Sequence, residues 1–477
     1  MKLTELAKQL QGARLVGGDI EIGSLCTDSR VAGEGDLFFC FRGTHSDSHE
    51  YAGEAVRRGA AAVVAERELK LPCPQLLVED GREAMARIAA AFFQHPESKL
   101  KVVGITGTNG KTTTSYMLKN ILDEAGIKAG VIGTLGVEYG EHKVAPTLTT
   151  PDPVFLFSLL ADMAKAGVEV AVMEVSAHAL FLKKECPIEY ELGIFTNLTR
   201  DHLDFFKDMT EYGNAKKLLF QPSRCRFAIL NADDPFSEEL KGVPHTTYGI
   251  ETPADTFAVI ESENLRGSRV VLNLNDELME TKLAMTGKYN VLNALAAANA
   301  GRLLGADAGA VIRGLSLAAG RGRLEWIASH AGANIFVDFA HTPDGLEKSL
   351  GALKAHCKGN LIVLFGCGGN RDKGKRAAMG ERSARFSDFA VLTSDNPRYE
   401  DPCAILSEIE GGFRAVSKNY VIIEDREKAT EYAIKRLKKG DVLLVAGKGG
   451  ESYQEIMGIK YSYDDKDVIK SVLGKLQ

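Results

Sequence analysis

Short apolar runs alternate with amphipathic stretches along nearly the whole chain. We expect each run to form a buried strand, and longer periodic stretches such as 290–304 to form helices. The runs lie at 36–41, 60–65, 100–103, 167–174, 192–196, 226–230, 334–338, 360–365, 389–393 and 441–446. Because strands that alternate with helices build parallel sheets covered by helices, the pattern predicts an α/β fold.

Chain length and two linker-like segments predict three domains. At about 100 to 200 residues per domain, 477 residues are enough for three. A Pro-containing segment at 95–98 and a Gly/Arg segment at 320–323 interrupt the alternation. We therefore expect domains at 1–98, 99–320 and 321–477.

Composition narrows the functional class. A net charge of −6 and a pI near 6.0 argue against general nucleic-acid binding, which needs a basic face. No apolar run is long enough to span a bilayer, and residues 1–10 lack the apolar core of a signal peptide, so we expect a cytoplasmic protein with no membrane insertion. The eight cysteines are scattered singly, which predicts neither a zinc site nor a disulfide framework.

The glycine-rich segment 104–113 predicts a nucleoside triphosphate site. It lies between the strand at 100–103 and a helix expected to open at Thr113, so that backbone N–H groups converge on phosphate oxygens. Lys111 would reach the β and γ phosphates, and Thr112 would offer a hydroxyl to Mg²⁺. The spacing is one residue longer than the common P-loop pattern, and an ordinary glycine-rich turn is the alternative.

Other polar residues cluster where predicted strands end. Glu174 ends the strand at 167–174 and is a candidate Mg²⁺ ligand, with a solvent-facing side chain as the alternative. Segment 196–204 carries acids, an Arg and a His that could complete a metal or phosphate site, or could cap a helix. Lys216 has the pattern of a helical surface lysine. In 366–371, Arg371 occupies the place of the last Gly of a dinucleotide fingerprint, which disfavours a nicotinamide site.

Ordered motifs through all three blocks resemble those of the ATP-dependent Mur ligases of peptidoglycan synthesis. They are Asp28-Ser29-Arg30, Gly35-Asp36-Leu37-Phe38-Phe39, the loop 104–113, Leu148-Thr149-Thr150-Pro151, Glu174-Val175-Ser176, Thr196-Asn197-Leu198, Asp201-His202-Leu203-Asp204, Gly287-Lys288-Tyr289-Asn290-Val291, Gly322-Arg323-Leu324-Glu325, the segment 338–344 and Asp395-Asn396-Pro397-Arg398. The resemblance implies an N-terminal α/β domain that holds the UDP end of the substrate. It also implies a central P-loop ATPase domain with a mostly parallel sheet and a C-terminal Rossmann-like domain that brings the amino acid.

The resemblance also implies a reaction. The terminal carboxylate of UDP-N-acetylmuramoyl-L-alanyl-D-glutamate would attack the γ-phosphate of ATP, and the amine of meso-diaminopimelate would displace phosphate from the acyl phosphate. Charge neutralisation and positioning would supply the catalysis. Mg²⁺ is the implied cofactor, ATP the cosubstrate, and a monomer is expected.

Residue roles follow from the same resemblance. Catalytic roles fall to Lys111, Glu174, His202 and Lys216, the last as a carbamylated lysine (N6-carboxylysine). Metal ligands would be Thr112, Glu174 and His202. Nucleotide contacts would come from Gly107, Thr108, Asn109, Gly110, Lys111, Thr112, Thr113, Asn293, Arg323, Asp338 and His341. The UDP-muramoyl-dipeptide would meet Ser29, Thr149, Thr150, Ser176 and Lys184, and diaminopimelate would meet Arg371, Asp395, Asn396, Pro397, Arg398, Gly447 and Glu451.

The prediction that the ligase adds diaminopimelate rather than lysine depends on Arg398. A guanidinium matches the second carboxylate of diaminopimelate, whereas lysine offers only an ammonium there. A Pro-anchored turn with a surface Arg is the alternative. The chain departs from the family pattern at Gly450, Ala177, Leu182 and Lys184, which affects the muramoyl-peptide contacts most.

Three alternative functions are weighed against this one. The first is the same ligase acting with L-lysine, and the second is a sibling amide ligase such as a folylpolyglutamate synthetase. The sibling should lack both the 395–398 motif and the 28–30 region, which are present. The third, a nucleotide-binding protein without turnover, would tolerate loss of Lys111, Glu174, His202 or Lys216, and none is lost.

Overall fold

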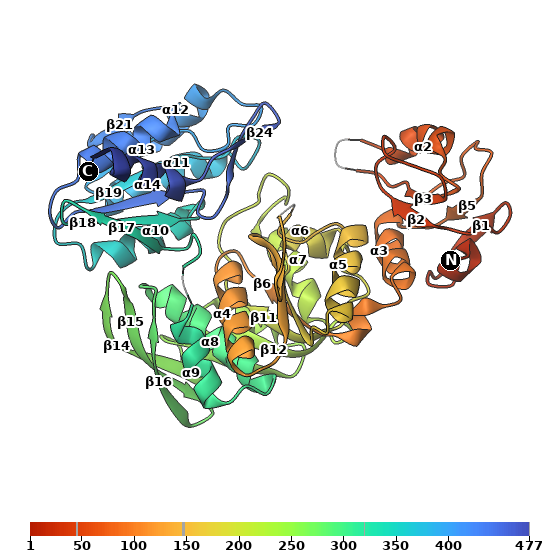
Figure 1. Ribbon diagram of the computed structural model, residues 1–477, viewed down its shortest axis with the longest axis horizontal. Helices are drawn as coiled ribbons and strands as arrows, with labels where there is room; N and C mark the ends of the chain where they lie inside the picture. The colour runs from red at the N-terminus through yellow and green to blue at the C-terminus, as the bar shows by residue number, and fades with distance from the viewer. Residues whose placement is uncertain (44–45, 146–147, 319, 477) are drawn as a thin grey trace. The chain divides into compact units, whose positions relative to one another are not determined.

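The computed structural model describes residues 1–43, 46–145, 148–318 and 320–476 (Figure 1). It is an α/β protein, which confirms the predicted class. The chain forms two compact units. The first comprises Met1–Gly104, Ile127–Gly193 and Ala215–Phe227, and the second comprises Ile105–Gly126, Ile194–Asn214 and Ala228–Gln477. The division into three domains at residues 98 and 320 stays a prediction.

The N-terminal sheet has five strands in the order β1-β5-β4-β3-β2. The elements are α1 (Leu3–Ala7), β1 (Arg14–Val16), β2 (Ser24–Cys26), β3 (Asp36–Phe39), α2 (Ala52–Arg58), β4 (Ala62–Ala65), β5 (Gln75–Leu77) and α3 (Gly81–Phe92). Side chains alternate across β3: Leu37 and Phe39 pack with α1 and α3, while Phe38 packs with α2. Helices therefore cover both faces, as a mostly parallel sheet requires.

The second sheet has eleven strands in the order β16-β15-β14-β13-β12-β11-β6-β10-β7-β8-β9. Its strands are β6 (Lys101–Thr106), β7 (Ala129–Gly133), β8 (Gly136–Tyr139), β9 (His142–Val144), β10 (Val170–Glu174), β11 (Tyr190–Phe195), β12 (Cys225–Asn231), β13 (His245–Gly249), β14 (Thr256–Asn264), β15 (Gly267–Leu274) and β16 (Glu277–Leu283). The helices of this stretch are α4 (Lys111–Glu124), α5 (Pro153–Lys165), α6 (Ala177–Phe181), α7 (Met209–Lys217), α8 (Lys288–Leu303) and α9 (Ala308–Ser316).

Two glycines let α4 pack closely against its neighbours α8 and α9 within the second unit. A Cβ at Gly314 would lie 2.5 Å from the Ile121 Cα, and one at Gly301 would lie 2.6 Å from the Ile121 Cγ2. Since real Cβ atoms do not approach so closely, both positions need glycine. The close packing holds α4, whose N-terminus carries the glycine-rich loop.

The C-terminal sheet has the order β17-β18-β22-β19-β20-β21 and is Rossmann-like. Its elements are β17 (Glu325–His330), β18 (Ala333–Asp338), α10 (Pro343–Lys354), β19 (Leu361–Phe365), α11 (Gly374–Phe386), β20 (Phe389–Leu392), α12 (Pro402–Arg414), β21 (Tyr420–Ile422), α13 (Arg426–Lys435), β22 (Val442–Ala446) and α14 (Asp465–Leu476). Helices α10, α11 and α12 share one apolar core with the sheet, and α13 and α14 share the other. All its strands are parallel except the β17 edge.

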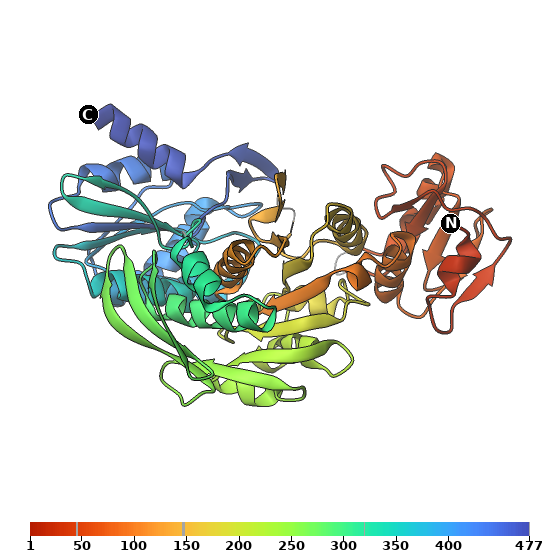
Figure 2. The same cartoon turned by 60° about the horizontal axis from the view of Figure 1, so that its bottom comes forward.

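Every predicted strand overlaps a strand of the structure, and the segment 290–304 corresponds to α8. Several boundaries differ: α4 begins at Lys111 rather than at Thr113, and the strand predicted at 167–174 begins only at Val170. The antiparallel strands β14, β15 and β16, drawn in green in Figure 2, were not predicted. Their buried and exposed residues largely alternate. β14 and β15 contain the short apolar runs 257–260 and 270–272, so a signal for these two strands was present in the sequence.

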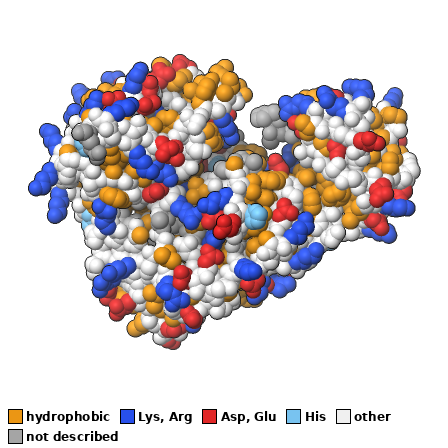
Figure 3. All heavy atoms as spheres, viewed as in Figure 1, with side chains coloured by type: hydrophobic (Ala, Val, Ile, Leu, Met, Phe, Trp, Pro, Cys, Tyr) orange, Lys and Arg blue, Asp and Glu red, His pale blue; other side chains and the backbone are white. Residues whose placement is uncertain are grey.

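The surface drawn in Figure 3 carries Lys and Arg side chains interspersed with Asp and Glu side chains. This mixture accords with the small net charge of the chain. None of the helices in the described part of the chain is both long and apolar enough to cross a membrane. The remaining elements are η1 (Ser48–Tyr51), η2 (Pro96–Lys99), η3 (Leu218–Phe220), η4 (Pro235–Leu240) and the hairpin of β23 (Tyr453–Ile456) with β24 (Ile459–Ser462).

Candidate active site

The loop between β6 and α4 has a backbone that demands glycine at two positions. Gly107 and Gly110 have φ values of +149° and +90°. A Cβ at Gly107 would lie 1.9 Å from the Thr196 hydroxyl oxygen, and one at Gly110 would lie 2.5 Å from the Asn293 Oδ1. Both glycines are therefore required by the packing of this loop against its neighbours. Its binding of phosphate stays a prediction.

The segment after β11 braces this loop within the second unit. The Thr196 hydroxyl donates to the Asn109 carbonyl at 2.6 Å, and the Asn109 N–H donates to the Asn197 Oδ1 at 2.9 Å. The Thr199 N–H donates to the Thr108 hydroxyl at 3.0 Å. Residues 196–199 therefore hold the loop in shape, a role that the helix-cap alternative does not include.

Lys111 curls back over the loop that precedes it. Its Nζ donates to the carbonyls of Gly107 at 2.8 Å and Thr108 at 3.0 Å. The buried Thr112 hydroxyl accepts a hydrogen bond from the Arg323 Nη2 at 3.1 Å. The Arg323 guanidinium also lies 4.2 Å from the centre of the Phe339 ring. Two cationic side chains thus converge on the N-terminus of α4, where an anion is already favoured.

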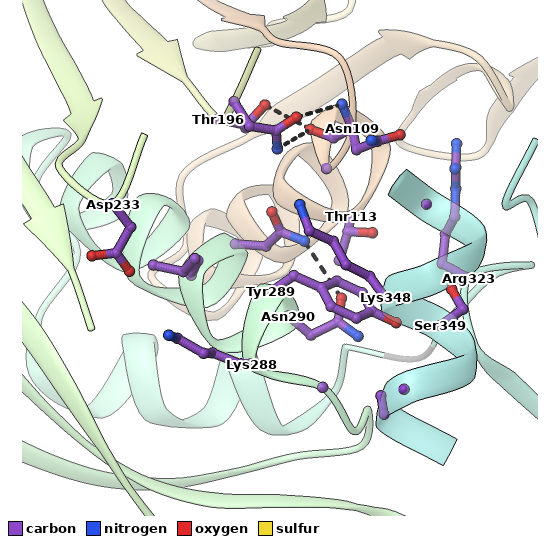
Figure 4. A pocket seen from close by; sticks show the side chains of 18 of the residues that line it. Asn109, Thr113, Thr196, Asp233, Lys288, Tyr289, Asn290, Arg323, Lys348 and Ser349 are labelled. Carbon is purple, nitrogen blue, oxygen red and sulfur yellow. Dashed lines mark hydrogen bonds between the residues drawn. The ribbon is translucent and has the colours of Figure 1, made fainter. Parts of the chain in front are cut away.

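A pocket of about 590 Å³ opens beside this loop in the second unit. Its lining includes Asn109, Gly110, Thr113, Asn293, Arg323 and Asp338, all predicted as nucleotide contacts. In Figure 4, Asp233 lies on one side of the pocket and Arg323 on the other, with Lys348 and Tyr289 between them. The volume lies in the range of small-molecule and cofactor sites.

Asp338 and His341 are held by hydrogen bonds to the main chain. The Asp338 carboxylate accepts from the N–H groups of Leu324 at 2.5 Å and Ala340 at 2.7 Å, so it fixes the turn that carries Arg323. Burial raises the pKa of Asp338. Burial, reinforced by Lys375, lowers the pKa of His341 to about 4, which leaves its imidazole neutral near pH 7.

Asp201 is a buried carboxylate among three basic side chains. Lys375 Nζ lies 3.4 Å from its Oδ1, and the Nε2 atoms of His202 and His341 lie 3.5 Å and 3.8 Å from its Oδ2. Burial alone would raise the pKa of Asp201, but these basic neighbours hold it below its ordinary value. His202, a predicted metal ligand, has a left-handed backbone with φ +58°.

Glu174 belongs to the first unit, where its side chain is fully buried rather than solvent-facing. Its two oxygens accept from the Thr134 N–H at 3.1 Å and the Thr134 hydroxyl at 2.9 Å. The Thr134 hydroxyl also contacts that of Thr149 at 3.2 Å. Thr150 donates to the Glu174 carbonyl at 2.9 Å and accepts from the Ser176 N–H at 3.0 Å. The structure therefore brings together three of the predicted muramoyl-peptide contacts beside Glu174.

The other predicted residues of the first unit are Lys216, Lys184 and Ser29. Lys216 is only 1% exposed on α7, so the surface-lysine alternative was wrong. Lys184 forms an ion pair with Asp152 at 2.7 Å. Ser29 donates to the Glu54 carboxylate at 3.3 Å.

The loops after β19 and β20 bring the predicted amino-acid contacts together in the second unit. Arg398 donates from Nη1 to the Gly369 carbonyl at 2.8 Å, and its Nε lies 3.2 Å from Glu455. Burial and the neighbouring Arg398 both lower the pKa of Arg371. A Cβ at Gly368 would lie 2.9 Å from the Arg398 Nη1 and 3.8 Å from the Arg371 Cγ, so both arginine side chains pass beside Gly368. Such a pair favours an anionic ligand between them. Arg398 is mostly buried, contrary to the surface-Arg alternative.

The rest of the 395–398 motif packs against residues 447–451. Asn396 Nδ2 donates to the Glu451 carboxylate at 3.0 Å. Gly447 has φ +111°, and a Cβ there would lie 2.5 Å from the Asp395 carboxylate. The Pro397 carbonyl lies so close to Gly369 that a Cβ there would be only 1.9 Å away. The motif therefore offers cationic, amide and acidic groups side by side.

Several residues of these sites were not predicted from the sequence: Thr134, Asp344, Lys375, Lys448 and Glu455. Asp344 accepts from the Asn109 side chain at 3.0 Å, and Lys375 pairs with Asp201. Asp344 ends the family motif 338–344, and Lys448 directly follows the predicted contact Gly447, so their positions in the sequence could have indicated both residues. The other three could be found only from contacts distant in the sequence.

Comparison with known proteins identifies the family. A model of the Mur ligase middle domain matches residues 105–301, and one of the Mur ligase glutamate ligase domain matches residues 322–449. A protein of Caldanaerobacter subterraneus subsp. tengcongensis named UDP-N-acetylmuramoyl-L-alanyl-D-glutamate--2,6-diaminopimelate ligase is 39% identical over 100% of this chain and 99% of its own length. The chain belongs to the Mur ligase family.

Further similarities extend over almost the entire Mur ligase chain. A protein of the same name from Geobacillus thermodenitrificans is 40% identical, covering 99% of both chains. A solved structure of a ligase with this name superimposes with a TM-score of 0.66 at 29% identity, over 95% of each chain. This Mur ligase therefore shares the fold of the solved structure and aligns with nearly all of both proteins.

Proposed function

We propose that this Mur ligase joins meso-diaminopimelate to UDP-N-acetylmuramoyl-L-alanyl-D-glutamate, with ATP converted to ADP and phosphate. Full-length relatives about 40% identical carry this activity in their names. The observation that supports the choice of amino acid is that the side chains of Arg371 and Arg398 both pass beside Gly368, close to Asn396, which is hydrogen-bonded to Glu451. An amino acid with a carboxylate and an ammonium at its far end matches this set of charges.

The reaction needs ATP because a carboxylate repels an amine and has no useful leaving group. One oxygen of the terminal carboxylate attacks the γ-phosphorus, the bond to the β-γ bridging oxygen breaks, and ADP leaves. The amine of diaminopimelate then attacks the acyl carbon, phosphate leaves with the former carboxylate oxygen, and the nitrogen loses a proton as the amide forms. Lys111 and Arg323, at the N-terminus of α4, neutralise the phosphate charge in this scheme.

Magnesium fits the residues present. The described residues contain no cluster of three or more His, Cys, Asp or Glu that could hold a metal. Mg²⁺ needs no such cluster, because one or two carboxylates, a hydroxyl, substrate phosphates and water suffice. The Thr112 hydroxyl of the second unit and the Glu174 carboxylate of the first unit are each oxygen donors of the kind that Mg²⁺ takes. Their joint role, like that of His202, is assigned by family resemblance alone. When bound, the ion would offset phosphate charge. Carbamylation of Lys216, the monomeric state and the cytoplasmic location stay predictions.

An isotope experiment tests the acyl-phosphate route. UDP-muramoyl-dipeptide labelled with ¹⁸O in its terminal carboxylate is incubated with ATP, Mg²⁺ and diaminopimelate, and the released phosphate is analysed by mass spectrometry. Because the departing phosphate keeps the attacking carboxylate oxygen, we expect one ¹⁸O per phosphate. Unlabelled phosphate accompanying tripeptide product would rule out this route, and phosphate without product would indicate simple ATP hydrolysis.

A further inference from the structure

Lys448 is a fully buried lysine within the glycine-rich segment 447–451. Its Nζ donates to the Asn396 Oδ1 at 3.0 Å and lies 3.3 Å from the Glu451 Oε2. The centres of the Tyr453 and Tyr463 rings lie 5.7 Å and 6.0 Å from the same nitrogen. A buried ammonium requires such partners, and here its partners are two residues of the proposed amino-acid site.

Hydrogen bonds around Asn396 determine which way its amide points. Two donors converge on Oδ1: the Lys448 ammonium at 3.0 Å and the Glu455 N–H at 2.9 Å. An amide nitrogen in that position would place donors against donors. Nδ2 is therefore directed to the Glu451 carboxylate, to which it donates at 3.0 Å. Lys448 thus sets the orientation of Asn396 as well as contacting Glu451.

Lys448 also opposes the electrostatic effect of Asp395 on Glu451. Burial and the neighbouring Asp395 raise the pKa of Glu451, while Lys448 and the Asn396 hydrogen bond act in the opposite direction. Asp395 is itself stabilised as a carboxylate by Lys448 and Arg426, although burial acts against this. Without Lys448, the neighbouring carboxyl groups of Asp395 and Glu451 would lose a cation that favours the ionised form of each.

We propose that Lys448 is a positioning residue for amino-acid recognition, acting through Asn396 and Glu451 rather than by contact with substrate. The inference rests on the proposed function, in which these two residues bind diaminopimelate. The ammonium keeps Glu451 in the form that can receive a substrate ammonium, and it keeps the Asn396 amide turned toward that carboxylate. Lys448 therefore differs from Asn396 and Glu451, which contact the substrate directly in the proposed function.

The test is steady-state ADP release by Lys448→Met, with diaminopimelate varied while ATP and UDP-muramoyl-dipeptide are saturating. We expect the KM for diaminopimelate to rise roughly 10- to 100-fold, the range for loss of a hydrogen bond to a charged group, while the KM for ATP stays unchanged. Lys460→Met is the matched control, because Lys460 is an exposed lysine of β24 that lies over the Tyr453 ring. It should retain wild-type constants.

A double-mutant cycle separates positioning from general structural support. If Lys448 acts through Glu451, adding Lys448→Met to Glu451→Gln should raise the KM for diaminopimelate little further. Additive effects, an unchanged KM, or an equal loss of ATP affinity would overturn the role. If the Met variant does not fold, Lys448→Gln is assayed in its place, with the same outcomes decisive. Wild-type turnover that ignores diaminopimelate would instead overturn the proposed function, which the wild-type arm detects separately.

Discussion

Arg398→Lys should raise the KM for diaminopimelate about 100-fold, the upper size expected when a hydrogen bond to a charged group is lost. The Arg398 Nε faces Glu455 and Nη1 donates to Gly369, so these contacts anchor the side chain by one edge. The Nη2 donors remain for a substrate carboxylate. A lysine ammonium cannot reproduce this planar geometry. The measurement is ADP release as a function of diaminopimelate concentration.

The specificity of this effect can be checked on the same protein. Arg385→Lys is a matched control, since Arg385 pairs with Glu381 on the exposed face of α11, and it should retain wild-type constants. ATP affinity of Arg398→Lys should also be unchanged. An unaltered KM for diaminopimelate in Arg398→Lys would show that Arg398 does not read the second carboxylate.

Lys111→Met should lower kcat roughly 1,000-fold, as expected for loss of a cation that stabilises charge in phosphoryl transfer. In the structure Lys111 Nζ rests on the carbonyls of Gly107 and Thr108, so it is already inside the loop that would surround the phosphates. Methionine keeps the length of the side chain and removes the charge. The measurement is single-turnover ADP formation at saturating ATP.

Lys119→Met provides the comparison on the same helix. Lys119 lies two turns further along α4 and pairs with Asp123 at 2.6 Å. Its loss should leave kcat within about twofold, because this partly buried ion pair lies on α4 beyond the glycine-rich loop. Similar kcat values for the Lys111 and Lys119 variants would contradict a phosphate role for Lys111.

Local features of the chain were sufficient to predict the nucleotide loop and most strands. Gly107 and Gly110 are required by backbone conformations and by close approaches that only glycine permits, and such requirements show in the sequence. The strand at 167–174 ends in Glu174 because the apolar run stops there. The α/β class follows from the same alternation, since parallel strands are apolar on both faces.

The features that could not be predicted from the sequence depend on contacts between residues far apart in the chain. Lys216 has the local pattern of a surface lysine, and only the packing around α7 makes it 1% exposed. Lys448 and Asn396 are 52 positions apart, so their hydrogen bond has no local signature. Strands β14 and β15 do carry local signals, the apolar runs 257–260 and 270–272, and what the sequence could not give is their antiparallel pairing with each other and with β16.

The most direct test of the proposed ligase activity is amino-acid-dependent ADP release by the purified protein. ATP, Mg²⁺ and UDP-N-acetylmuramoyl-L-alanyl-D-glutamate are supplied with meso-diaminopimelate, with L-lysine, or with no amino acid. We expect rapid ADP release with diaminopimelate and only background ADP release in the other two reactions. Release that depends on lysine would contradict the assignment of Arg398, and background release in all three reactions would contradict the proposed function.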